Sequence, residues 1–89
     1  MEKLFITKHA LERIFERFIS PAECVKVLEN GKIIEDYPDD KPFPSRLMLG
    51  EVNGRFIHIV VSQNNENFYL ITAYEPDPEL WDETFLKRK

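Results

Sequence analysis

The dipeptide Asn53-Gly54 constrains the fold of this chain more than any other feature of its sequence. Both residues accept a positive φ angle, and they separate two apolar runs at residues 47–52 and 55–62. The dipeptide is therefore predicted to form the two-residue turn of a β-hairpin. Such a turn places His58 opposite Leu49 in an antiparallel pair.

Two further runs have the same period of two and extend this hairpin into a sheet. Residues 32–37 and 68–73 are predicted strands, and the Asp- and Pro-rich residues 38–44 are a predicted loop. The sequence therefore predicts a four-stranded antiparallel meander. The connection after Gln63 decides its register, because an odd effective length puts His58 opposite Thr72 and an even one puts it opposite Ala73.

The N-terminal part of the chain has a helical period instead. A first helix is predicted from about Lys8 to Phe18, with Thr7 as its N-cap. Its apolar stripe has i, i+3, i+4, i+7 spacing and consists of Leu11, Ile14, Phe15 and Phe18.

A second helix is predicted to follow at once. Ser20, Pro21 and Glu23 provide an N-cap, a first-turn proline and a capping-box acid, and Asn30-Gly31 ends the helix. The side chains expected to face the core are Cys24, Val27 and Leu28. Residues 79–85 are predicted to add a short C-terminal helical turn. The predicted class is α+β, with two N-terminal helices packed on the sheet.

Length and composition limit what this fold can do. With 89 residues, of which 43% are apolar, the chain is expected to form one domain over residues 1–89 around one small core. No apolar run approaches the ~20 residues that span a bilayer, and the single cysteine excludes an internal disulfide, so we expect a cytoplasmic protein. The net charge of −4 argues against binding of duplex DNA.

The first candidate functional group lies on the first helix. His9, Arg13 and Arg17 are spaced i, i+4, i+8 and form one stripe, whereas Glu12 and Glu16 fall outside it. Stacked like charges cost about 0.2–0.5 kcal/mol relative to a neutral pair. Either the arginines reach carboxylates on the sheet or in the acidic loop, or they bind an anion.

The second candidate group lies on the sheet. His58 interrupts an otherwise apolar strand, and it is either a structural histidine with satisfied hydrogen bonds or a group that transfers protons or binds substrate. Tyr74 ends the last strand, where it either covers the core or contacts a phosphate or a base. Cys24 is expected to pack in the core. No metal is expected, because a metal site would need His9 and His58 to converge with a carboxylate.

Four motifs in order along the chain resemble those of the bacterial family called domain of unknown function 4258, DUF4258. They read TKHALERIFERFIS at 7–20, GKIIEDY at 31–37, FIHIVV at 56–61 and ITAYEP at 71–76. The resemblance implies an α+β domain similar in plan to the RelE-like toxin ribonucleases and their barnase-like relatives. It therefore implies cleavage of single-stranded RNA without a metal or other cofactor, and an antitoxin-like protein partner.

This resemblance also implies roles for particular residues. His9 or His58 would act as the acid or base, and Tyr74 would orient the phosphate. The substrate-binding residues would be Arg13, Arg17 and Thr72. The alternative is a non-catalytic binding module of the same fold, in which the His/Arg stripe of the first helix grips an acidic or phosphorylated partner.

Overall fold

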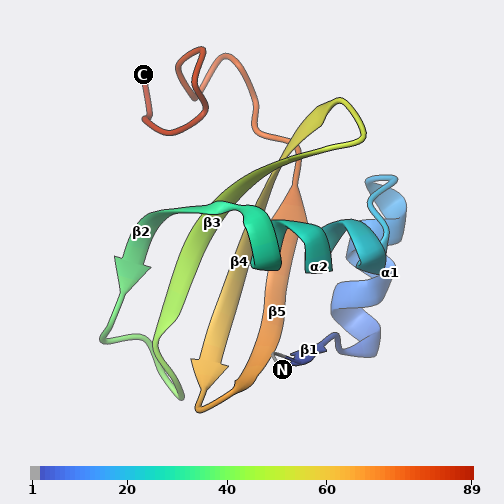
Figure 1. Cartoon of the computed structure of the whole chain (residues 1–89), viewed down its shortest axis with the longest axis vertical. Coiled ribbons are helices and arrows are strands. Elements are labelled where there is room, and N and C mark those ends of the chain that lie inside the picture. The colour runs from blue at the N-terminus through green and yellow to red at the C-terminus, as the bar shows by residue number, and fades with distance from the viewer. Residues whose placement is uncertain (1–2) are drawn as a thin grey trace.

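Two helices and five strands form the part of the chain that the computed structural model describes, residues 3–89 (Figure 1). The α+β class predicted from the sequence is confirmed. In chain order the elements are β1 (Lys3–Phe5), α1 (Lys8–Glu16), α2 (Pro21–Asn30), β2 (Lys32–Tyr37), β3 (Ser45–Val52), β4 (Arg55–Asn64) and β5 (Asn67–Tyr74).

The strands form one mixed sheet in the order β1-β5-β4-β3-β2. Strands β2 to β5 pair antiparallel, but β1 pairs parallel to β5, with Leu4 opposite Phe68. The predicted four-stranded antiparallel meander is therefore wrong. The strand that was missed has three residues, which are too few to show an alternating pattern.

Residues 79–85 form no helix, and the predicted C-terminal helical turn is present only as one turn at residues 77–81. The N–H groups of Leu80 and Trp81 both donate to the carbonyl of Asp77 at 3.0 Å, which closes a single turn before that stretch continues as a loop. The side chains of Asp77 and Asp82 accept backbone N–H groups two residues further on, at 2.9 Å each, and this local bonding competes with a helix. Residues 75–89 are called the C-terminal segment below.

The two hairpins differ in how well they follow the prediction. Asn53 and Gly54 have φ angles of 53° and 82°, and Leu49 pairs with His58, so the first hairpin is confirmed. The second has a bulge, because Val61 pairs with Leu70 whereas Val60 pairs with Thr72. The extra residue places His58 opposite Tyr74, which neither predicted register allows.

The helix boundaries follow from the capping signals. The Thr7 side chain accepts from the N–H of Ala10 at 3.1 Å and begins α1, while Ser20 and Glu23 form the predicted capping box of α2. A side chain at Gly31 would meet the carbonyl oxygen of Val27 at 2.5 Å and that of Leu49 at 2.6 Å. Glycine is therefore required at position 31, where the end of α2 approaches the backbone of β3.

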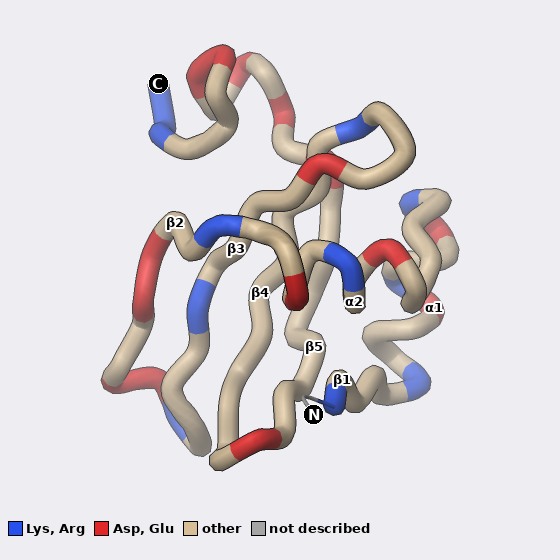
Figure 2. The backbone as a smooth tube through the Cα atoms, in the orientation of Figure 1, with Lys and Arg blue, Asp and Glu red and all other residues tan. Residues whose placement is uncertain are grey.

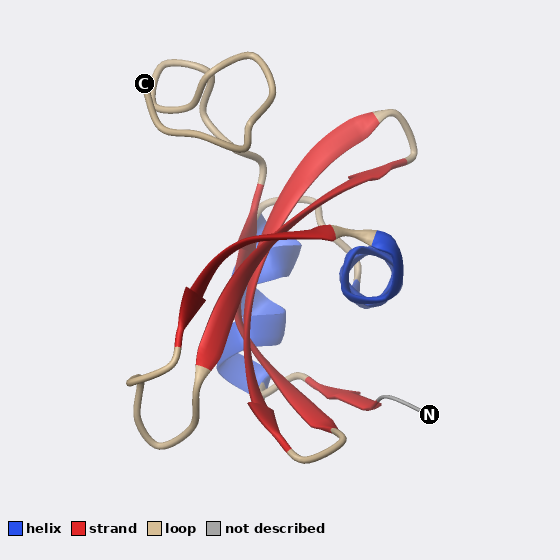
Figure 3. Ribbon diagram, turned by 60° about the vertical axis from the view of Figure 1, so that its left-hand side comes forward, coloured by secondary structure: helices blue, strands red, loops and turns tan. Residues whose placement is uncertain are grey.

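Both helices lie on one side of the sheet, as Figure 3 shows, and the main core lies between them and the strands. The predicted inward positions of α2, namely Cys24, Val27 and Leu28, are buried. In α1, Ala10 and Ile14 are buried, but the predicted stripe residues Phe15 and Phe18 are 67% and 86% exposed. Neither helix of the described chain is long and apolar enough to cross a membrane.

Candidate functional site

The candidate residues lie in two separate environments. One is the histidine cluster, which we define as His58, Tyr74, Trp81 and Phe85, on the sheet face that points away from the helices. The other is the basic stripe of α1, defined as His9, Arg13 and Arg17.

His58 is fully buried and both of its ring nitrogens contact other groups of the protein. Its Nε2 atom lies 2.8 Å from the carbonyl oxygen of Phe85, and its Nδ1 atom lies 3.4 Å from the hydroxyl of Tyr74. A carbonyl can only accept, so Nε2 carries the proton and the Tyr74 hydroxyl donates to Nδ1. The ring also meets Trp81 edge-on, with ring centroids 4.5 Å apart.

The surroundings of His58 keep it neutral. Burial lowers its pKa from 6.5, the Phe85 carbonyl opposes this shift, and the positive charge of Arg88 adds to it. Burial raises the pKa of the Tyr74 hydroxyl. The arrangement therefore matches the structural interpretation of His58, because no ring nitrogen is free to meet a substrate.

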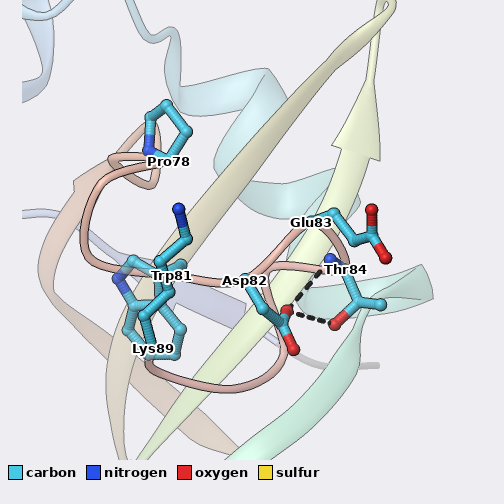
Figure 4. Close-up of a pocket in the computed structure, with 6 residues that line it drawn as sticks. All are labelled: Pro78, Trp81, Asp82, Glu83, Thr84 and Lys89. Carbon is cyan, nitrogen blue, oxygen red and sulfur yellow. Dashed lines mark hydrogen bonds between the residues drawn. The ribbon is translucent and has the colours of Figure 1, made fainter.

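The C-terminal segment that covers this cluster has a cavity of its own. Figure 4 shows this cavity, which has a volume of about 400 Å³, and the Asp82 carboxylate accepting from the N–H and hydroxyl of Thr84 at 2.9 and 2.6 Å. The Arg88 guanidinium carbon lies 4.8 Å from the centroid of the Trp81 ring. None of the predicted site residues lines the cavity. Its lining is Pro78, Trp81, Asp82, Glu83, Thr84 and Lys89.

Arg17 connects α1 to the edge of the sheet. Its Nη1 atom donates to the Thr72 hydroxyl at 3.1 Å and to the carbonyl of Ala73 at 2.9 Å. The structural partner of Arg17 is thus the edge of β5. One of the two sequence interpretations expected a carboxylate there instead. Within residues 3–89 its Nε and Nη2 atoms make no hydrogen bond, so part of the guanidinium stays open while its position is fixed.

His9 and Arg13 complete the stripe on the exposed side of α1. In the described part of the chain, neither makes a side-chain hydrogen bond or a salt bridge. Lys and Arg are scattered singly or in short groups among Asp and Glu, with tan stretches between them (Figure 2). The stripe is therefore a local cluster of basic side chains rather than part of a long basic surface.

Arg55 and Glu23 form a partly buried ion pair that sequence reasoning missed. The Arg55 Nη2 atom lies 2.7 Å from Glu23 Oε1, its Nε atom lies 3.3 Å from Oε2, and Nη2 also donates to the carbonyl of Phe18. Bonds from the Ser20 N–H and then from Arg55 lower the Glu23 pKa to about 2. The pair fixes the end of α1 and the start of α2 to β4. Only the capping box gave a signal for Glu23.

The histidines do not share a metal site, because His58 is buried and His9 is exposed. In the described part of the chain, no three His, Cys, Asp or Glu side chains are placed together to bind a metal.

Cys24 is buried, which confirms its predicted place in the core. Burial also raises the pKa of its thiol to about 11.

These features define a small α+β domain with a buried histidine cluster and an exposed basic helix face. Residues 6–75 match the family described as domain of unknown function (DUF4258). Because this match covers more than half of the chain, the protein belongs to the DUF4258 family, as its motifs predicted. No curated protein and no solved structure matches the chain.

Proposed function

We propose that this DUF4258 domain is a non-catalytic binding module that holds an acidic or phosphorylated protein partner through the basic stripe of α1. The observation that supports it most is the state of Arg13, which is exposed and has no hydrogen bond or salt bridge in the described chain. Arg17 follows one helical turn later with part of its guanidinium open.

The local energetics favour an anion between these two arginines. Each guanidinium can bind a carboxylate or phosphate with two parallel hydrogen bonds. An anion that contacts both removes the like-charge repulsion of the pair, which costs about 0.2–0.5 kcal/mol in its absence. Thr72 and the Ala73 carbonyl hold Arg17 before the partner arrives, so less side-chain entropy is lost on binding.

Cleavage of RNA in the manner of the RelE-like toxins is the other function considered. It needs a histidine that can reach the 2′-hydroxyl or the leaving oxygen of the substrate. The burial of His58 beneath Trp81, with its Nε2 atom on the Phe85 carbonyl, argues against His58 in this role and supports the binding module, and it leaves His9 as the histidine that an RNA could reach.

The binding proposal can be tested with labelled peptides and fluorescence anisotropy. We expect a phosphoserine peptide and an acidic peptide to bind, and the unphosphorylated neutral peptide not to bind. Arg13→Gln should weaken binding about tenfold, because a charge-assisted bond is lost. Lys26→Gln removes one charge from the exposed side of α2 and should leave the affinity within about twofold. Equal losses in both variants would contradict a site on α1.

The nuclease alternative is tested by incubating the protein with single-stranded RNA in EDTA, which disables contaminating metal-dependent nucleases. We expect no cleavage. Cleavage by the wild type that disappears in His9→Ala, which should leave the fold intact, would overturn the non-catalytic proposal and support proton transfer by this side chain.

A further inference from the structure

The C-terminal end of α1 displays two large apolar side chains to solvent. Phe15 is 67% exposed and Phe18 is 86% exposed. With Ile19 and Pro21 they line most of a hollow of about 280 Å³ at the turn between α1 and α2. Exposed apolar side chains that gather around a hollow are typical of interaction surfaces.

Phe18 is not explained by the fold. Its φ angle is 58°, in the left-handed region that bulky residues rarely adopt, and it stands just after the C-cap of α1, where glycine is favoured. Its carbonyl is held by Arg55, so the backbone is fixed while the ring remains outside the core. Neither backbone preference nor packing therefore favours a phenylalanine at this position.

The charges beside the hollow indicate what would bind there. Glu12 and Glu16 are exposed on α1, one turn before Phe15 and directly after it, while Arg17 turns toward the β5 edge. Neither glutamate lines the hollow, but both flank Phe15 at its edge, whereas the carboxylate in the lining, Glu23, is paired with Arg55. A second copy of the chain would bring the same acidic residues together, and opposed like charges disfavour that contact.

We propose that Phe15 and Phe18 form a docking surface for a protein segment that inserts a large apolar side chain into the hollow and places basic side chains against Glu12 and Glu16. Anchors of this kind carry most of the binding energy of small interfaces. Phe15 lies two residues after Arg13, which places it on nearly the opposite side of the helix. The docking surface is therefore distinct from the basic stripe and does not rest on the function proposed for it.

The probe for this surface is a labelled amphipathic helical peptide with leucines on one face and lysines beside them. We expect this peptide to bind, and a peptide with glutamates in place of the lysines to bind at least about tenfold more weakly. Phe18→Gly should reduce binding at least about tenfold and raise the melting temperature by a few degrees, because glycine accepts the positive φ.

Two variants serve as controls for this experiment. Leu80→Ala shortens another exposed apolar side chain, in the C-terminal segment, and should leave peptide binding unchanged. Arg13→Gln should not weaken binding of this basic peptide, which separates this proposal from the basic stripe. The proposal would be overturned if the lysine peptide did not bind, if the two peptides bound equally, or if Phe18→Gly bound the lysine peptide as well as the wild type does. A lowered melting temperature of Phe18→Gly would also overturn it. So would sedimentation showing that the free chain dimerises through Phe18.

Discussion

His58 and His9 are the two histidines of the chain, and their surroundings are opposite. In the histidine cluster, the ring nitrogens of His58 contact Phe85 and Tyr74 inside the protein. On α1, His9 and Arg13 are exposed without a hydrogen bond in the described chain. The type of a side chain indicates which chemistry it can perform, but the contacts made by the fold determine whether it is available to a partner.

The largest expected effect concerns the cluster. His58→Ala should lower the free energy of unfolding by about 3 kcal/mol, because it leaves a cavity beside Trp81 and removes the partner of the Phe85 carbonyl. Urea unfolding followed by Trp81 fluorescence measures this loss. His9→Ala is the matched control and should change stability by less than about 0.5 kcal/mol. Similar losses in the two variants would remove the distinction between the two sites.

The next effect concerns the ion pair that anchors α1. Glu23→Gln should cost about 2 kcal/mol, because Arg55 then loses its partly buried partner. The Glu23 pKa is lowered from 4.5 to about 2, so its contribution is complete above pH 4.5 and is lost as the pH falls toward 2. Wild type and variant should therefore converge in acid. Glu29→Gln, on the exposed side of α2, should show no such difference.

A smaller effect is expected from the titration of His58. Its pKa in the folded chain is below 6.5, so the unfolded chain binds the proton first and stability falls as the pH drops from 6.5 toward the folded value. The His58 ring faces Tyr74, Trp81 and the Phe85 carbonyl. The positive charge of Arg88 opposes protonation of His58. The free energy of unfolding should fall as the pH drops below 6.5, and this decline should be absent in His58→Gln.

The smallest effect on stability is expected on the basic stripe. Arg13→Gln should change the free energy of unfolding by less than about 0.5 kcal/mol, because its side chain has no bond to lose in the described chain. Arg17→Gln should cost about 1 kcal/mol, since it loses its bonds to Thr72 and Ala73. Thermal unfolding compares the two. Substantial unfolding of Arg13→Gln would instead identify Arg13 as a structural ion-pair partner.

Local signals in the sequence predicted most of the fold. The Asn53-Gly54 turn, the Thr7 cap and the capping box of α2 depend on neighbouring residues, and all three were found where the sequence placed them. Strand β1 and the bulge between β4 and β5 were missed, because a parallel edge strand and one extra residue leave no periodic pattern.

The candidate site was less predictable because its contacts join distant parts of the chain. The bond of His58 to Phe85 spans 27 residues, and that of Arg55 to Glu23 spans 32. The sequence identified His58, Tyr74, Thr72 and Arg17 as chemically suitable side chains. It could not show that a segment after residue 75 covers His58, or that Arg17 binds the edge of β5.

The distinction between the two sites is tested most directly by a titration with the phosphoserine peptide, followed by amide chemical shifts in two-dimensional NMR. Binding through α1 predicts that the largest shift changes lie in residues 8–17 and at Thr72, whereas the side-chain signal of Trp81 stays in place. Changes centred on His58, Tyr74 and Trp81, or no change on α1 at saturation, would contradict the assignment of the binding site to the basic stripe.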